Sequence, residues 1–175
     1  MKKLFLLLAI VGMTAIQSCD GPEGPQGPPG PAGSSVEAEV FEIRNVNFIG
    51  DSNGFYGISY DLNPAILNSD MILVYRLKAV AGNLDVWESL PKTYYLPNGE
   101  LDYNFDFTAE DIEIYLGFTS PEVLTAQYTS NQIFRVVIIP GYLSNKVSAI
   151  DTNNFDHIKT ALKLTEEDFT GSQRN

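Results

Sequence analysis

The side chains best suited to chemistry are few in this chain of 175 residues, which contains one cysteine and one histidine. A single cysteine, Cys19, excludes a disulfide within the chain. His157 follows Asp156 in a segment with helical periodicity, and one histidine cannot form a zinc site built from several histidines. The sequence also lacks a Gly-x-Ser-x-Gly setting for a nucleophilic serine. We therefore expect His157 to be an exposed helix residue and the protein not to be an enzyme.

Carboxylates are the next candidates, because a pair can hydrolyse a glycosidic bond and a cluster can ligate calcium. The densest group consists of Asp102, Asp106, Glu110, Asp111 and Glu113. Asp102 and Asp106 lie on the polar side of an alternating segment, where solvated charge is expected. We thus interpret the group as a solvated surface, with calcium ligation and a catalytic pair as alternatives, and predict no metal or cofactor.

Three aromatic residues form the third candidate set, namely Trp87, Tyr94 and Tyr95. If they were exposed on one sheet face, their flat apolar rings would form a platform for sugars. The alternative is that Trp87 lies in the core and the tyrosine hydroxyls are hydrogen-bonded at the core's edge. The sequence favours the core and leaves a glycan platform as the alternative.

The segment before Cys19 has the order of a secretory signal, with a basic start, an apolar run and a cleavage region. The apolar run from Leu4 to Met13 is about half of the roughly 20 residues that a membrane-spanning helix needs. We therefore expect residues 1–18 to be removed.

Ile16-Gln17-Ser18-Cys19 resembles the lipobox of bacterial lipoproteins, in which a small residue precedes the cysteine that becomes the mature N-terminus. The thiolate of that cysteine is a nucleophile that can take a thioether-linked diacylglycerol. The resemblance implies that Cys19 is the lipidation site and that the membrane is a partner through the lipid. An ordinary secretory signal with an incidental or free cysteine is the alternative.

Residues 19–35 continue as a stalk in which glycine occupies every third position, at Gly21, Gly24, Gly27, Gly30 and Gly33. This is the collagen-like Gly-Pro-X pattern, which lets three polyproline-II chains share one axis. Five triplets also suit a single-chain spacer of about 45 Å, at about 3.1 Å per residue. We favour the spacer, with a homotrimer as the alternative.

Together, Ser18 to Gly30 resemble the start of the collagen-like lipoproteins of Bacteroidota. In that family a lipobox is followed by a few Gly-Pro-X triplets and a small, mostly β domain of unknown function. The resemblance implies an outer-membrane or cell-surface lipoprotein of the cell envelope. Asp20 and Glu23 fit the acidic residues that favour surface export in that group, and the choice between a periplasmic and a surface-facing leaflet stays open.

The net charge of −11 argues against a nucleic-acid partner, because phosphate binding needs a basic surface. Residues 1–18 contain two lysines and no acidic residue, so their removal changes the charge from −11 to −13. Such an acidic protein should not adhere to an anionic bilayer by its surface. The lipid would hold it there.

Residues 36–175 alternate apolar and polar side chains, which is typical of half-buried antiparallel strands. We expect a mainly β, antiparallel β-sandwich-like domain with one C-terminal helix. The predicted strands are 36–49, 56–62, 71–80, 86–95, 101–107, 112–119 and 132–139, with 132–139 central because Val136 to Ile139 is apolar on both faces.

Turn residues separate these strands, and Asn98-Gly99 should close a hairpin. The predicted helix is capped by Asp151 or Thr152 and has an apolar face of Phe155, Ile158, Ala161 and Leu162. Taken together, the sequence predicts a non-enzymatic, lipid-anchored envelope protein with a structural or adhesive role. A glycan-binding module of the cell surface is the alternative, and the protein or glycan partner stays open.

Overall fold

The computed structural model describes residues 38–143, 150–165 and 168–169. The chain divides into two units, residues 1–34 and 35–175, and the described residues all belong to the second. The predicted signal segment, Cys19 and the five repeat glycines from Gly21 to Gly33 lie outside the described residues.

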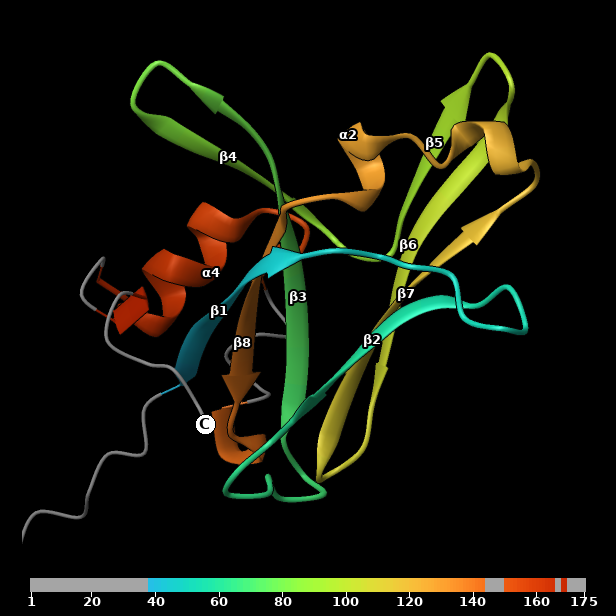
Figure 1. Ribbon diagram of the computed structural model, residues 1–175. Coiled ribbons are helices and arrows are strands. Elements are labelled where there is room, and N and C mark those ends of the chain that lie inside the picture. Colours follow the sequence, from blue (N-terminus) through green and yellow to red (C-terminus); the bar gives the residue numbers. More distant parts are fainter. Residues whose placement is uncertain (1–37, 144–149, 166–167, 170–175) are drawn as a thin grey trace, which may run out of the picture. The chain divides into compact units, whose positions relative to one another are not determined.

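The second unit is a sandwich of two four-stranded antiparallel sheets (Figure 1). The first sheet has the order β1-β8-β3-β4, with strands Glu39–Val46, Gln132–Ile139, Met71–Ala81 and Leu84–Ser89. The second has the order β2-β7-β6-β5, with strands Tyr56–Asp61, Asp111–Phe118, Gly99–Phe107 and Lys92–Leu96. The prediction of a mainly β, sandwich-like domain is confirmed.

Strand β8 is the centre of the first sheet, because it pairs with β1 on one side and β3 on the other. Phe134, Val136 and Ile138 face the core between the two sheets, whereas Val137 and Ile139 face a second apolar cluster. The prediction that this strand is central is confirmed, and its continuous apolar run is explained by burial on both faces.

The predicted strand 86–95 is wrong, since this segment forms two strands in different sheets. β4 ends at Ser89 and β5 begins at Lys92, with Leu90-Pro91 between them. Proline has no backbone N–H to donate to a sheet, so the ladder is interrupted at Pro91. The chain uses this interruption to pass from the first sheet to the second.

Two tight hairpins follow the turn residues of the sequence. Leu96 pairs with Gly99 across the β5–β6 turn, as predicted, and Gly99 has a φ of +140°. Gly82-Asn83 closes the β3–β4 hairpin, where Ala81 pairs with Leu84. The end of this second hairpin extends beyond the rest of its sheet, at the upper left of Figure 1.

Helix α4 (Phe155–Leu162) confirms the predicted C-terminal helix and packs on the outer face of the first sheet. Phe155 and Ile158 are buried, while Ala161 and Leu162 are half-buried. The predicted cap is wrong, because the Asn154 side chain accepts from the backbone N–H of Asp156, one turn nearer the helix than Asp151.

Three short helical turns were not predicted. They are η1 (Pro121–Val123) and α2 (Ala126–Thr129) between β7 and β8, and η2 (Gly141–Leu143) after β8. Segments of three or four residues are too short for a helical period to be recognised in the sequence.

Candidate functional site

A hollow of about 530 Å³ lies between the β3–β4 hairpin and the start of α4. Binding sites for small molecules have volumes of about 300–1,000 Å³. Two other hollows, beside Phe107 and beside Tyr128, have volumes of about 210 and 200 Å³ and fall below that range. Of these three hollows in the described part of the chain, the one at the hairpin is therefore the candidate site.

The lining of this hollow combines an apolar side with a polar side. The apolar residues are Ala81, Leu84, Val86, Trp87 and Phe155, and the polar ones are Asp85, Asn153, Asn154 and Asp156. Leu84 on the hairpin is 74% exposed, so its side chain is available to a ligand. A ligand that has both an apolar face and polar groups would suit such a lining.

Trp87 is half-buried, and its ring is held in place by two neighbours. The ring centroid of Phe155 lies 6.1 Å from that of Trp87, and the guanidinium carbon of Arg135 lies 4.0 Å from it. Arg135 also lies 4.0 Å from the ring centroid of Phe169. The ring of Phe155 lies 4.8 Å away, so the guanidinium contacts three rings and fixes the orientation of Trp87.

The charge of Arg135 is offset by a buried carboxylate. Arg135 Nε and Nη2 donate to Glu42 Oε1 at 3.1 and 2.7 Å, and Glu42 also forms an ion pair with the more exposed Arg44. A buried arginine with such partners is compatible with the apolar surroundings of the second cluster.

The polar side of the hollow is ordered by local hydrogen bonds. Ser89 Oγ donates to Asn153 Oδ1 at 3.1 Å, and the Asn153 amide nitrogen donates to Asp151 Oδ1 at 3.2 Å. Asn154 Oδ1 caps α4. Within the described residues, the carboxylates of Asp85 and Asp156 have no ion-pair partner, and both side chains are exposed.

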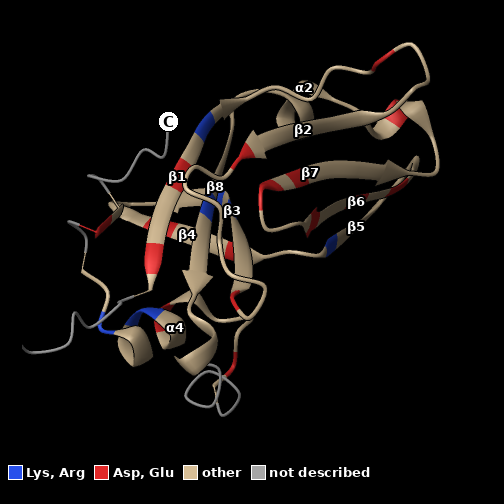
Figure 2. Cartoon of the chain, turned by 90° about the horizontal axis from the view of Figure 1, so that it is seen from below, with Lys and Arg blue, Asp and Glu red and all other residues tan. Residues whose placement is uncertain are grey.

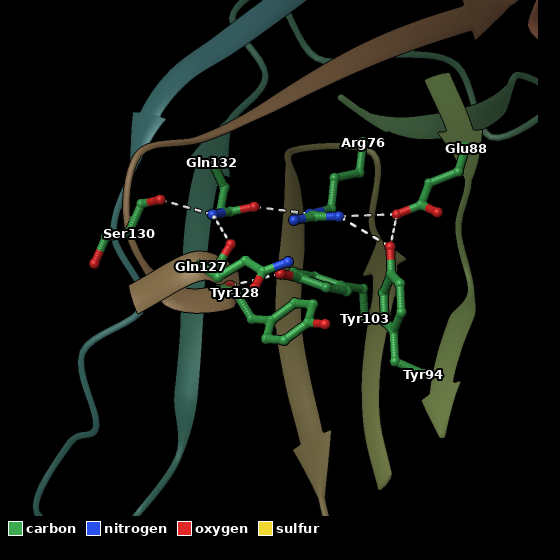
Figure 3. A network of polar contacts seen from close by, with 8 residues as sticks. All are labelled: Arg76, Glu88, Tyr94, Tyr103, Gln127, Tyr128, Ser130 and Gln132. Atoms are coloured by element: carbon green, nitrogen blue, oxygen red, sulfur yellow. Dashed lines mark hydrogen bonds and ion pairs between the residues drawn. The ribbon is translucent and has the colours of Figure 1, made fainter. Parts of the chain in front are cut away.

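The base of the hairpin is fixed by a buried network around Arg76 on β3 (Figure 3). Arg76 pairs directly with Glu88 across the β3–β4 ladder, and its Nη1 donates to Glu88 Oε1 at 2.9 Å. The Tyr94 hydroxyl accepts from the same nitrogen at 2.9 Å and donates to Glu88 Oε1. These contacts join β3, β4 and β5, and thus the two sheets.

The network continues to the turn before β8. Arg76 Nε donates to Gln132 Oε1 at 2.8 Å, and Gln132 Nε2 donates to the carbonyl oxygens of Gln127 and Ser130. The Tyr103 ring lies 4.5 Å from the Arg76 guanidinium, and its hydroxyl donates to the Tyr128 carbonyl at 2.5 Å. Burial raises the pKa of Tyr103 well above its ordinary value, while the charge of Arg76 partly opposes that shift.

The three aromatic residues that the alternative interpretation placed on a glycan platform do not share a surface. Trp87 lines the hollow and packs in the cluster under α4. Tyr94 packs against the core between the sheets, whereas Tyr95 is 80% exposed on the opposite face of β5. Trp87 alone remains a candidate for contact with a ligand at the hollow.

The carboxylate group is brought together only in part, since Asp106 pairs with Glu113 across the β6–β7 ladder. Asp111 accepts a hydrogen bond from Thr108, and Asp102 and Asp106 lie on β6, half-buried and exposed. Within the described residues, no group of three or more His, Cys, Asp or Glu side chains is placed to hold a metal ion. His157 is an exposed residue of α4, as predicted.

Sequence reasoning missed the contribution of Leu84, Asn153 and Asn154 to the hollow. The sequence did contain one signal for Leu84. A hairpin end is ordinarily polar, but apolar Val80, Leu84 and Val86 surround the Gly82-Asn83 turn, which indicates a surface for contact. Asn153 and Asn154 directly follow the predicted capping residues Asp151 and Thr152, and no pattern in the sequence distinguishes them as lining residues.

No helix in the described part of the chain is long and apolar enough to cross a membrane. No protein-family model matches the chain, and neither a search of curated proteins nor a search of solved structures finds a match.

Proposed function

We propose that this protein is a non-enzymatic, lipid-anchored protein of the cell envelope, at the outer membrane or cell surface, with a structural or adhesive role. The observation that carries this proposal is the order of segments along the chain. A lipobox-like Cys19 is followed by five triplets that begin with glycine, four of them Gly-Pro-X, and that end at residue 35; the first strand of the sandwich begins at Glu39.

Each segment has a physical task in this proposal. Two or more acyl chains on Cys19 give stable anchoring, at about 0.8 kcal/mol per buried methylene group. The stalk spaces the sandwich from the bilayer by up to about 45 Å as a single polyproline-II chain. The acidic surface of the domain disfavours its adsorption to anionic lipid, so the domain stays available to partners.

The anchoring is tested by expressing the chain and its Cys19→Ser variant in a Gram-negative host. We expect radioactive palmitate to label the unchanged chain and the label to be lost in the variant, which should leave the membrane fraction. Cys19 is the only cysteine, so no second thiol can substitute. A Cys19→Ser variant that still carries palmitate and stays in the membrane would refute the proposal.

The role of the stalk is tested by sedimentation of the lipidated chain in detergent. A monomeric mass supports the spacer. A trimeric mass that becomes monomeric when Gly27 is replaced by Ala supports the homotrimer instead, because only glycine fits on the axis of a triple helix.

A second candidate function is binding of a cell-surface glycan. It is favoured by the hollow at the β3–β4 hairpin, where an aromatic ring, aliphatic side chains and polar groups meet. This lining is typical of small-molecule sites, which combine apolar walls with a few polar groups that fix orientation. Glycan binding would make the lipid-anchored protein an adhesin.

A further inference from the structure

We propose that the hollow between the β3–β4 hairpin and α4 is a site for an uncharged oligosaccharide. A sugar ring would stack on Trp87, and its hydroxyl groups would donate to the carboxylates of Asp85 and Asp156. This inference rests on the proposed glycan-binding function and adds the location of the site and the class of sugar that it accepts.

The shape and the apolar side of the hollow suit a sugar ring. The volume of the hollow, about 530 Å³, can hold a short oligosaccharide segment and is much larger than a single water or ion needs. Trp87 offers a flat surface with a negative face, which attracts the weakly positive C–H groups on one side of a pyranose. Leu84 and Val86 also line the hollow and are 74% and 38% exposed.

The polar side presents mainly hydrogen-bond acceptors. Asn153 and Asn154 use their side-chain oxygens within the protein, to Ser89 and to the start of α4. The carboxylates of Asp85 and Asp156 remain exposed beside the amide N–H groups of Asn154, and each carboxylate has two acceptor oxygens. Neighbouring hydroxyl groups of a sugar are suitable donors, and hydrogen bonds to a carboxylate are stronger than neutral ones.

The charges of the hollow select against acidic sugars. Asp85 and Asp156 are both negative, and none of its described lining residues is Lys or Arg. Acidic residues are distributed over both sheets of the domain (Figure 2), which adds to the repulsion. The start of α4 does not reverse this, because Asn154 caps the helix and Asp156 lies in its first turn.

The site is held in its shape before any ligand arrives. Arg135 and Phe155 fix Trp87 from the protein side, and the Arg76–Glu88 pair fixes the base of the hairpin. A ligand that binds a preorganised surface loses less free energy to the ordering of side chains. Weak sugar contacts then suffice for measurable affinity.

The test uses a built-in probe, because Trp87 is the only tryptophan in the chain. Tryptophan fluorescence of the full chain in detergent micelles therefore reports on this hollow alone. We expect at least one of cellohexaose, maltohexaose and mannohexaose to change its intensity and shift its emission to shorter wavelength. We expect hexagalacturonate, which is acidic, to cause no change.

Two variants locate the polar contacts. Asp85→Ala and Asp156→Ala should each weaken binding of the responding neutral hexasaccharide by about tenfold or more, as expected for a lost charge-assisted hydrogen bond. Asp106→Ala is the matched control, because Asp106 is an exposed carboxylate on β6, away from the hollow. All three residues are exposed, so the fold should be retained.

The outcomes separate the inference from the function on which it rests. If no hexasaccharide changes the fluorescence, both this inference and glycan binding are overturned. The proposal that Cys19 anchors the protein by a lipid is tested separately and does not depend on this outcome. If hexagalacturonate binds as well as the neutral sugars, or if the Asp85 and Asp156 variants bind like Asp106→Ala, the proposed sugar class or contacts are wrong and glycan binding stands.

Discussion

The two faces of the first sheet each bury one arginine, but they hold it in different ways. Arg76 points toward the core between the sheets and is bound by Glu88, Tyr94 and Gln132. Arg135 points toward α4, contacts the rings of Trp87 and Phe169, and has one carboxylate partner, Glu42. Both are 5% exposed.

The two arginines hold different parts of the domain together. The partners of Arg76 come from both sheets, so its network joins the sandwich at the base of the hairpin. The partners of Arg135 are mostly aromatic and belong to one sheet and the C-terminal segment, so it orients a surface that carries the hollow. We therefore expect substitution of Arg76 to change mainly the free energy of unfolding, and substitution of Arg135 to change mainly the orientation and exposure of Trp87.

The largest effect is expected for Arg76→Met. This change leaves the Glu88 carboxylate buried without its cation and removes a donor to Gln132, which should cost about 3–5 kcal/mol of unfolding free energy. Urea unfolding followed by circular dichroism measures the loss. The control Lys78→Met, an exposed cation on the same strand, should change stability by less than about 0.5 kcal/mol.

A double variant shows whether the unpaired charge causes that loss. Arg76→Met combined with Glu88→Leu should be more stable than Arg76→Met alone, because no buried charge remains without a partner. If the double variant is less stable than the single one, the network is not organised by its ion pair.

Arg135→Met should have a smaller effect on stability, about 2 kcal/mol, because Arg44 still offsets the charge of Glu42 and methionine keeps contact with the rings. The effect on Trp87 should be larger than in any inner-face variant, with emission shifted to longer wavelength. An unchanged spectrum would contradict the role of Arg135 in holding the ring.

Two buried tyrosines extend the comparison to alkaline pH. Tyr103 lies on β6 in the core between the sheets, and Tyr75 lies on the outer face of the first sheet. Burial is the main cause that raises the pKa of each well above the ordinary value of about 10. Above pH 10 the tyrosine of the unfolded chain loses its proton while the buried tyrosine keeps it, which favours unfolding. The free energy of unfolding is therefore unaffected by these tyrosines below pH 10 and falls as the pH rises from 10 toward the raised pKa. Each should contribute a decline of up to about 1.4 kcal/mol per pH unit.

Tyr75→Phe and Tyr103→Phe separate the two contributions. Each variant should make the stability between pH 10 and 11 less dependent on pH than in the unchanged chain, measured by urea unfolding at fixed ionic strength. Tyr95→Phe is the control, since Tyr95 is exposed. Equal pH dependence in all four proteins would exclude buried tyrosines as the cause.

The smallest effect is expected at the edge of the hollow, for Asn154→Ala. Loss of the cap of α4 should cost about 1 kcal/mol. Asn68→Ala, an exposed loop asparagine, serves as its control. If Asn154→Ala and Asn68→Ala have the same thermal unfolding midpoint, the cap does not stabilise the helix that forms one wall of the hollow.

Much of the architecture could be predicted from the sequence, because alternation and turn chemistry are local. Tyr56 to Leu62, Leu101 to Phe107 and the run around Val136 indicated their strands and even the central position of β8. Helix α4 followed from the spacing of Phe155 and Ile158. The collagen-like repeat and the lipobox-like cysteine were equally local patterns, and their roles remain predictions.

Only the tertiary structure decided which distant residues meet. Arg76 contacts Gln132 56 positions away, and Arg135 contacts Glu42 93 positions away, so no local pattern could reveal that these charges are buried. The same applies to Trp87, Tyr94 and Tyr95, which are neighbours in sequence but are separated when the chain changes sheets at Pro91. The period of a strand is a property of the chain itself, whereas burial and site geometry depend on how the strands pair and pack.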